Sequence, residues 1–201
     1  MATETEWGMW DPIGPPEARV VLGAADFPWW IAGGYALEAF AGRSWREHSD
    51  LDIGLYRGDQ LEMQALLADW ELDAADPPGN LRPWRRGEML PPGVHDIWAR
   101  EGPDGPWRFQ LMLNEHDDDE WIYRRDSRIQ RSFDSLTWRL FGVEYLAPEV
   151  QLLFKSKDPR PKDEEDFRQV APLLTFVQRH WLADALRLTS AGHSWIGQLT
   201  G

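Results

Sequence analysis

The alternating stretch at residues 49–55 limits the possible folds more than any other part of the sequence. Its aliphatic side chains fall on one face of a predicted strand, and Asp50 and Asp52 fall on the other face. Aspartate is depleted in strands, so two aspartates on one face need a reason. Carboxylates about 6.6 Å apart along a strand can converge on an oxygen-seeking cation such as Mg²⁺. An edge strand with a solvated, charged face would explain the same pattern without a metal.

A glycine pair lies upstream of this strand, between a predicted strand and a predicted helix. Residues 27–32 form a short aromatic and aliphatic run, Gly33 and Gly34 follow it, and residues 35–41 have helical character. Backbone N–H groups at such a turn can approach a phosphate closely, and the helix N-terminus adds the positive end of its dipole. Together with the aspartate-bearing strand, this arrangement is suited to Mg²⁺-dependent chemistry on a nucleotide.

Composition narrows the classes of function that the chain can have. The 201 residues, 42% hydrophobic and 27% charged, predict a globular protein with one compact domain and an appended element. With no cysteine in the sequence, disulfides, thiolate zinc sites and cysteine nucleophiles are excluded. Lys and Arg total 21 against 34 Asp and Glu, and the net charge of -13 argues against long nucleic acid as a partner. The same charge suits a cationic small substrate or bound divalent cations.

The sequence also predicts where the protein resides. It contains no apolar run near the 18 or so residues that a membrane helix needs, and its first six residues are acidic where a signal peptide would be basic. We therefore expect a cytoplasmic protein without a membrane segment. Thirteen tryptophans are many for this length and hint at a binding cleft or a dimer surface, but the oligomeric state stays open.

The remaining sequence predicts an α+β protein with a mixed sheet flanked by helices and a helical C-terminal part. We expect a catalytic part at residues 1–140 and a helical part at residues 141–201. Helices are predicted at residues 15–26, 60–68, 148–156 and 163–188, the last interrupted before Pro172. Strands are predicted at residues 70–74, 94–100 and 107–113, and a long loop, typical of a binding loop or lid, at residues 77–93.

The stretches Trp30–Glu38 and Gly42–Asp52 carry a resemblance to a known family. They resemble the nucleotidyltransferase signature of the polymerase-beta-like superfamily, and most of all the small aminoglycoside and lincosamide nucleotidyltransferases. The pattern of these enzymes includes Gly-Arg-x-x-Arg-x-His-x-Asp-x-Asp, which is found here at residues 42–52. The resemblance implies a nucleotidyltransferase fold.

The resemblance also implies an activity and a set of site residues. It implies transfer of a nucleoside monophosphate from a nucleoside triphosphate to a hydroxyl, with two Mg²⁺ ions. By position in the motif, Asp50 and Asp52 match the metal ligands, and Gly33 and Gly34 match the phosphate-binding turn.

The family also uses a third acidic residue on a later strand, as a metal ligand or general base. Glu115 is the first candidate for this role, catalytic and metal-binding, and Asp96 is the second. Asn114 is the alternative that would place a neutral amide at this position and remove the usual base.

Four basic side chains are candidates for the nucleotide's phosphates. Similar enzymes place a Lys or Arg from such a segment on the triphosphate, so Lys155 and Lys162 are predicted to bind it, although a solvated helix end explains the same cluster. Arg46 reaches a phosphate or forms a salt bridge with Glu47 or Asp50. His48 orients Asp50 or the phosphates, or has a structural role.

The sequence thus favours a Mg²⁺-dependent nucleotidyltransferase that acts on a small hydroxylated molecule, with an aminoglycoside-like antibiotic as one candidate acceptor. Two alternatives stay open. One is a degenerate member that binds nucleotide without turnover, which an absent third carboxylate would support. The other is a toxin-type nucleotidyltransferase acting on protein or tRNA, for which the acidic charge makes tRNA the less attractive target.

Overall fold

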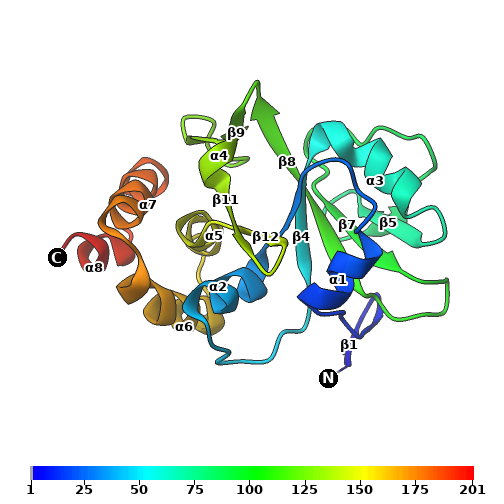
Figure 1. The fold of residues 1–201 in the computed structure, drawn as a ribbon, viewed down its shortest axis with the longest axis horizontal. Helices are drawn as coiled ribbons and strands as arrows, with labels where there is room; N and C mark the ends of the chain where they lie inside the picture. Colours follow the sequence, from blue (N-terminus) through cyan, green and yellow to red (C-terminus); the bar gives the residue numbers. More distant parts are fainter. Residues whose placement is uncertain (1) are drawn as a thin grey trace.

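A mixed β-sheet forms the centre of the computed structural model, which describes residues 2–201 (Figure 1). Its strands are β3 (Trp29–Ile31), β4 (Asp52–Tyr56), β5 (Glu71–Ala75), β6 (Leu81–Pro83), β7 (Asp96–Arg100), β8 (Phe109–Asp117), β9 (Glu120–Ile122), β10 (Gln130–Ser132), β11 (Thr137–Leu140) and β12 (Val143–Leu146). The spatial order is β11-β12-β3-β4-β8-β7-β5-β6, and β9 pairs with both β8 and β10. Since β4 runs antiparallel to β3 and parallel to β8, the predicted mixed sheet is confirmed.

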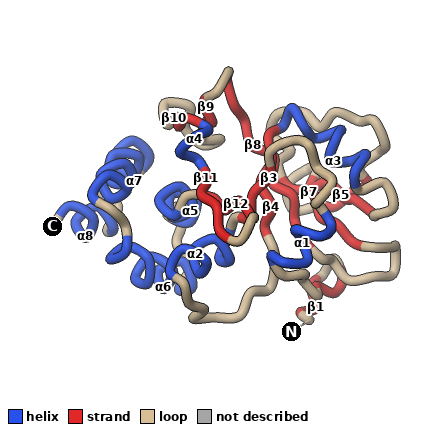
Figure 2. Tube along the Cα trace, in the orientation of Figure 1, coloured by secondary structure: helices blue, strands red, loops and turns tan. Residues whose placement is uncertain are grey.

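Helices flank the sheet on both sides and dominate the C-terminal part, as predicted (Figure 2). They are α1 (Pro15–Val21), α2 (Gly33–Ala41), α3 (Gln60–Leu66), α4 (Phe133–Leu136), α5 (Pro148–Lys155), α6 (Pro161–Val170), α7 (Phe176–Thr189) and α8 (Trp195–Thr200), with 3₁₀ turns η1 (Arg57–Asp59) and η2 (Ala171–Leu173). The long C-terminal helical stretch breaks at η2, which contains Pro172, as expected. None of the helices within residues 2–201 has the length and apolar character to cross a bilayer.

Two hydrophobic cores lie on the two sides of the sheet. The first joins Ile53 and Leu111 to α1 and α3, and the second joins Trp30 to α5, α7 and α8. Leu51, Ile53 and Leu55 are fully buried in the first core, as the alternation predicted, but Gly54 and Tyr56 are buried as well, so β4 is covered on both faces. The strand itself begins only at Asp52, so Asp50 lies in the loop that precedes it rather than on the strand.

The sheet ends and the C-terminal helices begin a few residues after residue 140, the expected boundary between the two parts. The last strand of the sheet, β12, ends at Leu146, and the C-terminal helices begin with α5 at Pro148. In Figure 1, α5, α6, α7 and α8 form a group on one side of the sheet, while α1 and α3 lie on the other. The division into a catalytic and a helical part stays a prediction.

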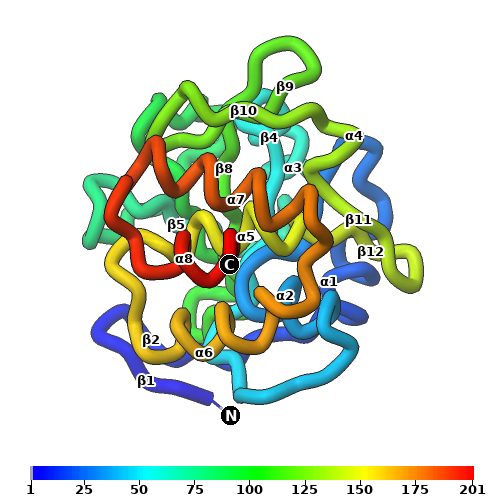
Figure 3. The backbone as a smooth tube through the Cα atoms, turned by 90° about the vertical axis from the view of Figure 1, so that its left-hand side faces the viewer, coloured from blue at the N-terminus to red at the C-terminus, as the bar shows by residue number. Residues whose placement is uncertain are grey.

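The sequence did not predict a small hairpin near the N-terminus, formed by β1 (Thr3–Thr5) and β2 (Gly8–Trp10). It is attached to the segment just before β8, because Trp107 N–H donates to the Met9 carbonyl at 2.8 Å and the Trp107 indole donates to the Trp7 carbonyl at 2.8 Å. In Figures 1 and 3 it lies at the end of the molecule that also carries the loop from α2 to β4.

The long loop predicted at residues 77–93 is folded against the sheet. Part of it forms β6, which pairs with β5. Arg82 fixes the segment by ion pairs with Asp76 and Glu88, both at 2.7 Å. These contacts make it a structured connection rather than a lid.

One buried carboxylate joins the loop before β4 to the C-terminal helices. Asp166, on α6, is completely buried and accepts hydrogen bonds from Arg46 at 3.0 and 2.9 Å and from the Trp45 indole at 2.9 Å. The Lys155 ammonium lies 2.9 Å from the same carboxylate. Burial alone would raise the pKa of Asp166, but Arg46 and Lys155 outweigh burial and hold this pKa below its usual value. Asp166 is therefore an ionised bridge between the two parts of the chain.

We expect Asp166→Asn to lower the free energy of unfolding by about 3 kcal/mol or more, because it leaves Arg46 and Lys155 largely buried without a shared counterion. Urea denaturation at pH 7 measures this loss. The matched control is Asp184→Asn, which removes an exposed pair with Arg187 on α7 and should change the free energy by no more than about 0.5 kcal/mol. An equally small loss for both variants would contradict the bridging role.

Candidate active site

The glycine pair forms the first two residues of α2 rather than a turn before it, and both positions are closed to larger residues. Gly33 has a φ of 68°, and a Cβ atom there would collide with the Asp52 carboxylate. A Cβ atom at Gly34 would collide with the side chains of Arg46 and His48. The glycines therefore let the Asp52 carboxylate and the predicted phosphate-binding residues meet at the N-terminus of α2.

A side chain from the helical part fixes this helix start. The Gly33 N–H donates to the Gln151 side-chain oxygen on α5 at 2.7 Å, so this amide is not free for a phosphate. The N-cap residue, Ala32, provides no side-chain cap, and the next first-turn N–H groups, beginning with Gly34, have no partner within the helix. These amides and the helix dipole remain available to an anion.

Burial and mutual repulsion act on the carboxylate pair formed by Asp50 and Asp52. Burial and the neighbouring charge of Asp50 raise the pKa of Asp52 to about 7, with Asp96 adding to the rise and Lys155 and Lys162 opposing it. A divalent cation beside the pair would remove this repulsion, so these side chains fit Mg²⁺.

The protein supplies only part of a metal's ligand set. Within residues 2–201, no cluster of three or more His, Cys, Asp or Glu side chains has the arrangement of a metal site. A Mg²⁺ ion at Asp50 and Asp52 would therefore take its other ligands from phosphates and water, which is how Mg²⁺ is usually held beside nucleotides.

The structure does not bring Glu115 to this pair. On β8, Gln110 is the residue opposite Asp52, and side chains alternate between the faces of the sheet, so Glu115 points to the opposite face. There the Arg57 guanidinium lies 2.6 Å from the Glu115 carboxylate. Glu115 is thus part of a salt bridge away from Asp52.

Asn114 shares the face of Asp52 but lies at the far end of β4, opposite Tyr56. Its amide donates to the Met112 carbonyl at 2.8 Å and accepts a hydrogen bond from the Trp121 indole at 3.0 Å. Asn114 is therefore a buried structural residue and does not take the place of a third carboxylate.

Asp96, the second candidate, lies on the same face of the sheet as Asp52. It is opposite Met112, which is in turn opposite Gly54, two residues along β4 from Asp52. One Asp96 oxygen is buried and makes no hydrogen bond within residues 2–201, and the nearest cation, Arg124, is 3.6 Å away. Asp96 therefore lies two strands away from Asp52, and its charge is close enough to add to the raised pKa of Asp52.

The two predicted lysines have different surroundings. Lys155 is almost buried and lies 3.0 and 2.9 Å from two carboxylates of α6, so its charge is already balanced. Lys162 is half-buried in the first turn of α6 and has no ion pair or hydrogen bond within residues 2–201. Burial and Arg160 lower the pKa of Lys162, while Asp50 acts in the opposite direction. Lys162 is therefore a cation without an ion-pair partner within residues 2–201, and its charge acts on the carboxylate pair.

Arg46 and His48 belong to the loop between α2 and β4, and their side chains lie against Gly34. Arg46 binds Asp166 rather than Glu47 or Asp50, the partners expected from the sequence. His48 Nε2 lies 2.9 Å from the Glu38 carboxylate, and its ring packs on Tyr35 with centroids 4.2 Å apart. Both side chains thus have partners in the protein that fix their positions.

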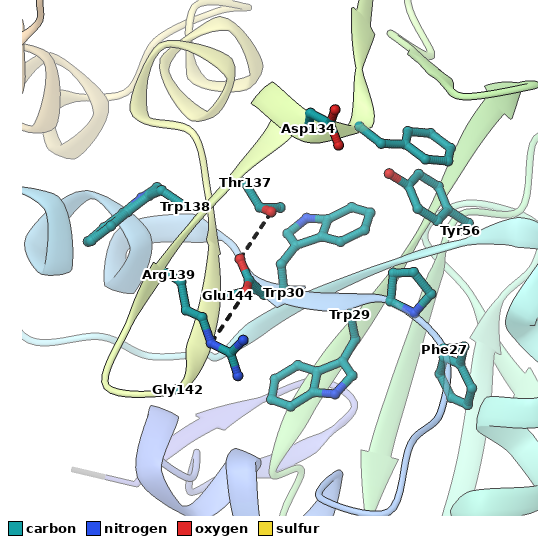
Figure 4. Close-up of a pocket in the computed structure, with 12 residues that line it drawn as sticks. Phe27, Trp29, Trp30, Tyr56, Asp134, Thr137, Trp138, Arg139, Gly142 and Glu144 are labelled. Atoms are coloured by element: carbon teal, nitrogen blue, oxygen red, sulfur yellow. Dashed lines mark hydrogen bonds and ion pairs between the residues drawn. The ribbon is translucent and has the colours of Figure 1, made fainter.

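Two cavities lie at opposite ends of β4. One, of about 640 Å³, is lined by Trp30, Tyr56 and Glu144 among others and includes neither Asp50 nor Asp52 (Figure 4). The other, of about 240 Å³, opens beside Asp50. It is lined by Thr3, Thr5, Trp10, Ser49, Asp50, Trp98 and Gln110. Apart from Asp50, sequence patterns carried no signal for these residues, because they come from the hairpin, the loop before β4, and the strands β7 and β8.

Comparisons with known proteins agree with this geometry. Residues 18–77, which include the glycine pair and both motif aspartates, match the family model described as aminoglycoside-2''-adenylyltransferase. No curated protein matches the chain significantly.

Among solved structures, the lincomycin-bound lincosamide antibiotic adenylyltransferase LnuA is similar with a TM-score of 0.55 at 14% identity, over 82% of this chain and 100% of that one. ANT(2'')-Ia in complex with adenylyl-2''-tobramycin is similar with a TM-score of 0.54 at 16% identity, over 85% of this chain and 94% of that one. A solution structure of ANT(2'')-Ia gives a TM-score of 0.54 at 17% identity, over 86% and 88% of the two chains. The expected resemblance is confirmed, and the chain has the α+β fold of these nucleotidyltransferases.

Proposed function

We propose that this chain is an enzyme that transfers a nucleoside monophosphate from a nucleoside triphosphate to a hydroxyl of a small molecule. The observation that carries the proposal is the contact between Asp52 and the N-terminus of α2, where Gly33 leaves no room for a Cβ atom. This contact puts a cation-binding group and an anion-binding helix end side by side, as a metal–triphosphate complex requires. The family match over residues 18–77 supports the same activity.

Each residue near this contact has a role in the proposal. Asp50 and Asp52 would hold Mg²⁺, with one or two ions, and the amides that begin at Gly34 would bind phosphate oxygens. Lys162 adds the positive charge that these groups leave unbalanced. When bound, Mg²⁺ would neutralise the charge that develops on the phosphate oxygens. Arg46 and His48 then act as positioning residues, because their protein partners are already in place.

The reaction joins the acceptor oxygen to the α-phosphorus of the triphosphate. The bond from this phosphorus to the bridging oxygen breaks, pyrophosphate leaves, and the acceptor's proton passes to a base. Asp96 is the proposed base, since it shares the face of Asp52 and has an oxygen without a hydrogen bond.

The proposed co-substrates follow from the similar enzymes and from charge. ATP is the proposed donor. One similar structure is named an adenylyltransferase, and the other is a complex with adenylyl-2''-tobramycin. The net charge of -13 favours a cationic acceptor, for which an aminoglycoside-like antibiotic is the leading candidate.

A nucleotide-binding protein without turnover is the second candidate. The observation that favours it is the neutral Gln110, which occupies the strand position directly beside Asp52. An amide cannot accept the acceptor's proton, so in this case no base would act from that position.

The double variant Asp50→Asn/Asp52→Asn should lose at least about 100-fold in Mg²⁺-dependent affinity for a non-hydrolysable ATP analogue, because both metal ligands become neutral. Isothermal titration calorimetry measures the affinity, and circular dichroism checks that the fold is retained. The control is Asp117→Asn/Asp119→Asn, which makes the same charge change at the exposed turn after β8. Equal affinities for wild type and the motif variant would refute the metal assignment.

Lys162→Ala should weaken triphosphate binding by about 10-fold or more and monophosphate binding less, since the lost contact is charge-assisted and grows with phosphate charge. Lys157→Ala removes an exposed lysine of the same segment and is the control, with no expected change. Affinities for both ligands at two salt concentrations test the contrast. Equal, small losses of affinity for both ligands in Lys162→Ala would mean that Lys162 contacts solvent and not the triphosphate.

Asp96→Asn should reduce the rate of pyrophosphate release by on the order of 10² to 10⁴ while leaving nucleotide affinity nearly unchanged. Glu115→Gln, which alters the salt bridge with Arg57 on the opposite face, should keep a rate close to wild type. The reverse order of the two rates would return the base to Glu115 and remove Asp96 from the mechanism.

A further inference from the structure

The N-terminal hairpin forms one wall of the smaller cavity, which Asp50 also lines. Opposite it, Trp98 and Gln110 occupy the same row of the sheet as Asp52, because Gln110 pairs with Asp52 on one side and with Trp98 on the other. Asp50 lines the cavity between the hairpin and this row. A molecule in the cavity would therefore lie next to the proposed metal–triphosphate complex.

The hairpin wall is firmly attached to the sheet. Trp10 is buried and packs edge-to-face on Trp98 with centroids 4.9 Å apart, and Trp98 packs in the same way on Trp107 at 5.5 Å. The Asp11 N–H donates to the Trp107 carbonyl at 3.0 Å, and the Arg108 guanidinium lies 2.6 Å from the Asp11 carboxylate. The cavity is therefore a formed feature of the fold.

Several polar groups in the cavity lack strong partners. The Gln110 amide and the Thr3 hydroxyl make no side-chain hydrogen bond within residues 2–201, and Asp50 receives only a long one, 3.4 Å, from Ser49. The Trp10 and Trp98 rings provide apolar surface beside them. Aromatic surface with a few free hydroxyl, amide and carboxylate groups suits a compact ring that carries hydroxyl groups.

We propose that this cavity is the acceptor subsite and that the acceptor places a hydroxylated, glycoside-like ring in it. Gln110 and Thr3 hydrogen-bond the ring, the tryptophans provide its apolar contact, and the negative charge of the site suits amino substituents. The hairpin precedes residue 18, where the family match begins, so that match assigns no role to it. This inference rests on the proposed function, because it orients the acceptor hydroxyl toward the nucleotide.

The position of Gln110 beside Asp52 indicates a binding role for this neutral side chain. An amide beside Asp52 can accept a hydrogen bond from one hydroxyl and donate to another, but it cannot remove a proton. Gln110 is therefore a binding residue for the acceptor, while the proton goes to Asp96 across the same face of the sheet.

Calorimetric titration with tobramycin as the probe, in the presence of Mg²⁺ and a non-hydrolysable ATP analogue, tests the subsite. We expect Gln110→Ala and Thr3→Val each to weaken tobramycin binding by about 3- to 10-fold, the loss of one hydrogen bond, with nucleotide affinity unchanged. Thr137→Val is the matched control, because it removes a threonine hydroxyl in the cavity at the other end of β4 and should leave tobramycin affinity unchanged. Cadaverine, a cation without a ring, should bind more weakly and without dependence on Gln110.

The outcomes separate this inference from the proposed function. Equal tobramycin affinities in wild type, Gln110→Ala and Thr3→Val, or no binding to wild type, would overturn the subsite. A loss of affinity in Thr137→Val alone would move the acceptor to the larger cavity and also overturn it. Pyrophosphate release from wild type with MgATP and tobramycin is measured separately. Its absence, with the binding losses still present, would contradict the proposed function and leave a ring-binding cavity.

Discussion

The ion-paired carboxylate of Asp166 is the interaction on which the arrangement of the site depends. A completely buried carboxylate must be balanced by cations, and here Arg46 comes from the loop before β4 while Lys155 comes from α5. These two segments are held together because both cations share this carboxylate, which is the only ion-pair partner of Arg46 within residues 2–201. Gln151 on α5 makes the second connection, to the amide of Gly33. The helical part therefore holds the loop before β4 and the start of α2 in position, although few of its own groups would touch a ligand.

The charges of the site divide into those that the protein balances and those that it leaves open. Arg46, Lys155 and Asp166 neutralise one another, whereas Asp50, Asp52 and Lys162 form no ion pair within residues 2–201, although their charges influence one another. Burial and the charge of Asp50 disfavour the ionised form of Asp52, and this is the cause of its raised pKa. A metal–triphosphate complex carries both signs of charge and would satisfy both halves. This complementarity, more than the size of any cavity, locates the proposed chemistry.

Local physical rules made much of this site predictable from the sequence. Alternation along β4 predicted which side chains enter the first core, because a strand places successive residues on opposite faces. Gly33 and Gly34 were predictable because close approach of backbone and side chains excludes larger residues there. The position of the third carboxylate was not predictable, because the face on which Glu115 lies depends on the register between β8 and β4. A shift of one residue in that register would reverse the choice between Asn114 and Glu115. Asp166 and Gln151 form contacts across more than 100 residues, for which spacing gives no signal.

Paramagnetic broadening of backbone amide resonances tests the location of the site most directly. Mn²⁺ replaces Mg²⁺ together with a non-hydrolysable ATP analogue, and the ¹⁵N–¹H signals of the protein are recorded with and without the nucleotide. We predict nucleotide-dependent broadening centred on Gly34, Asp50, Asp52 and Lys162, because these residues surround the proposed complex. Broadening centred instead on Tyr56, Thr137 and Glu144, around the larger cavity, would contradict the assignment of the metal–triphosphate site to the aspartate pair and the N-terminus of α2.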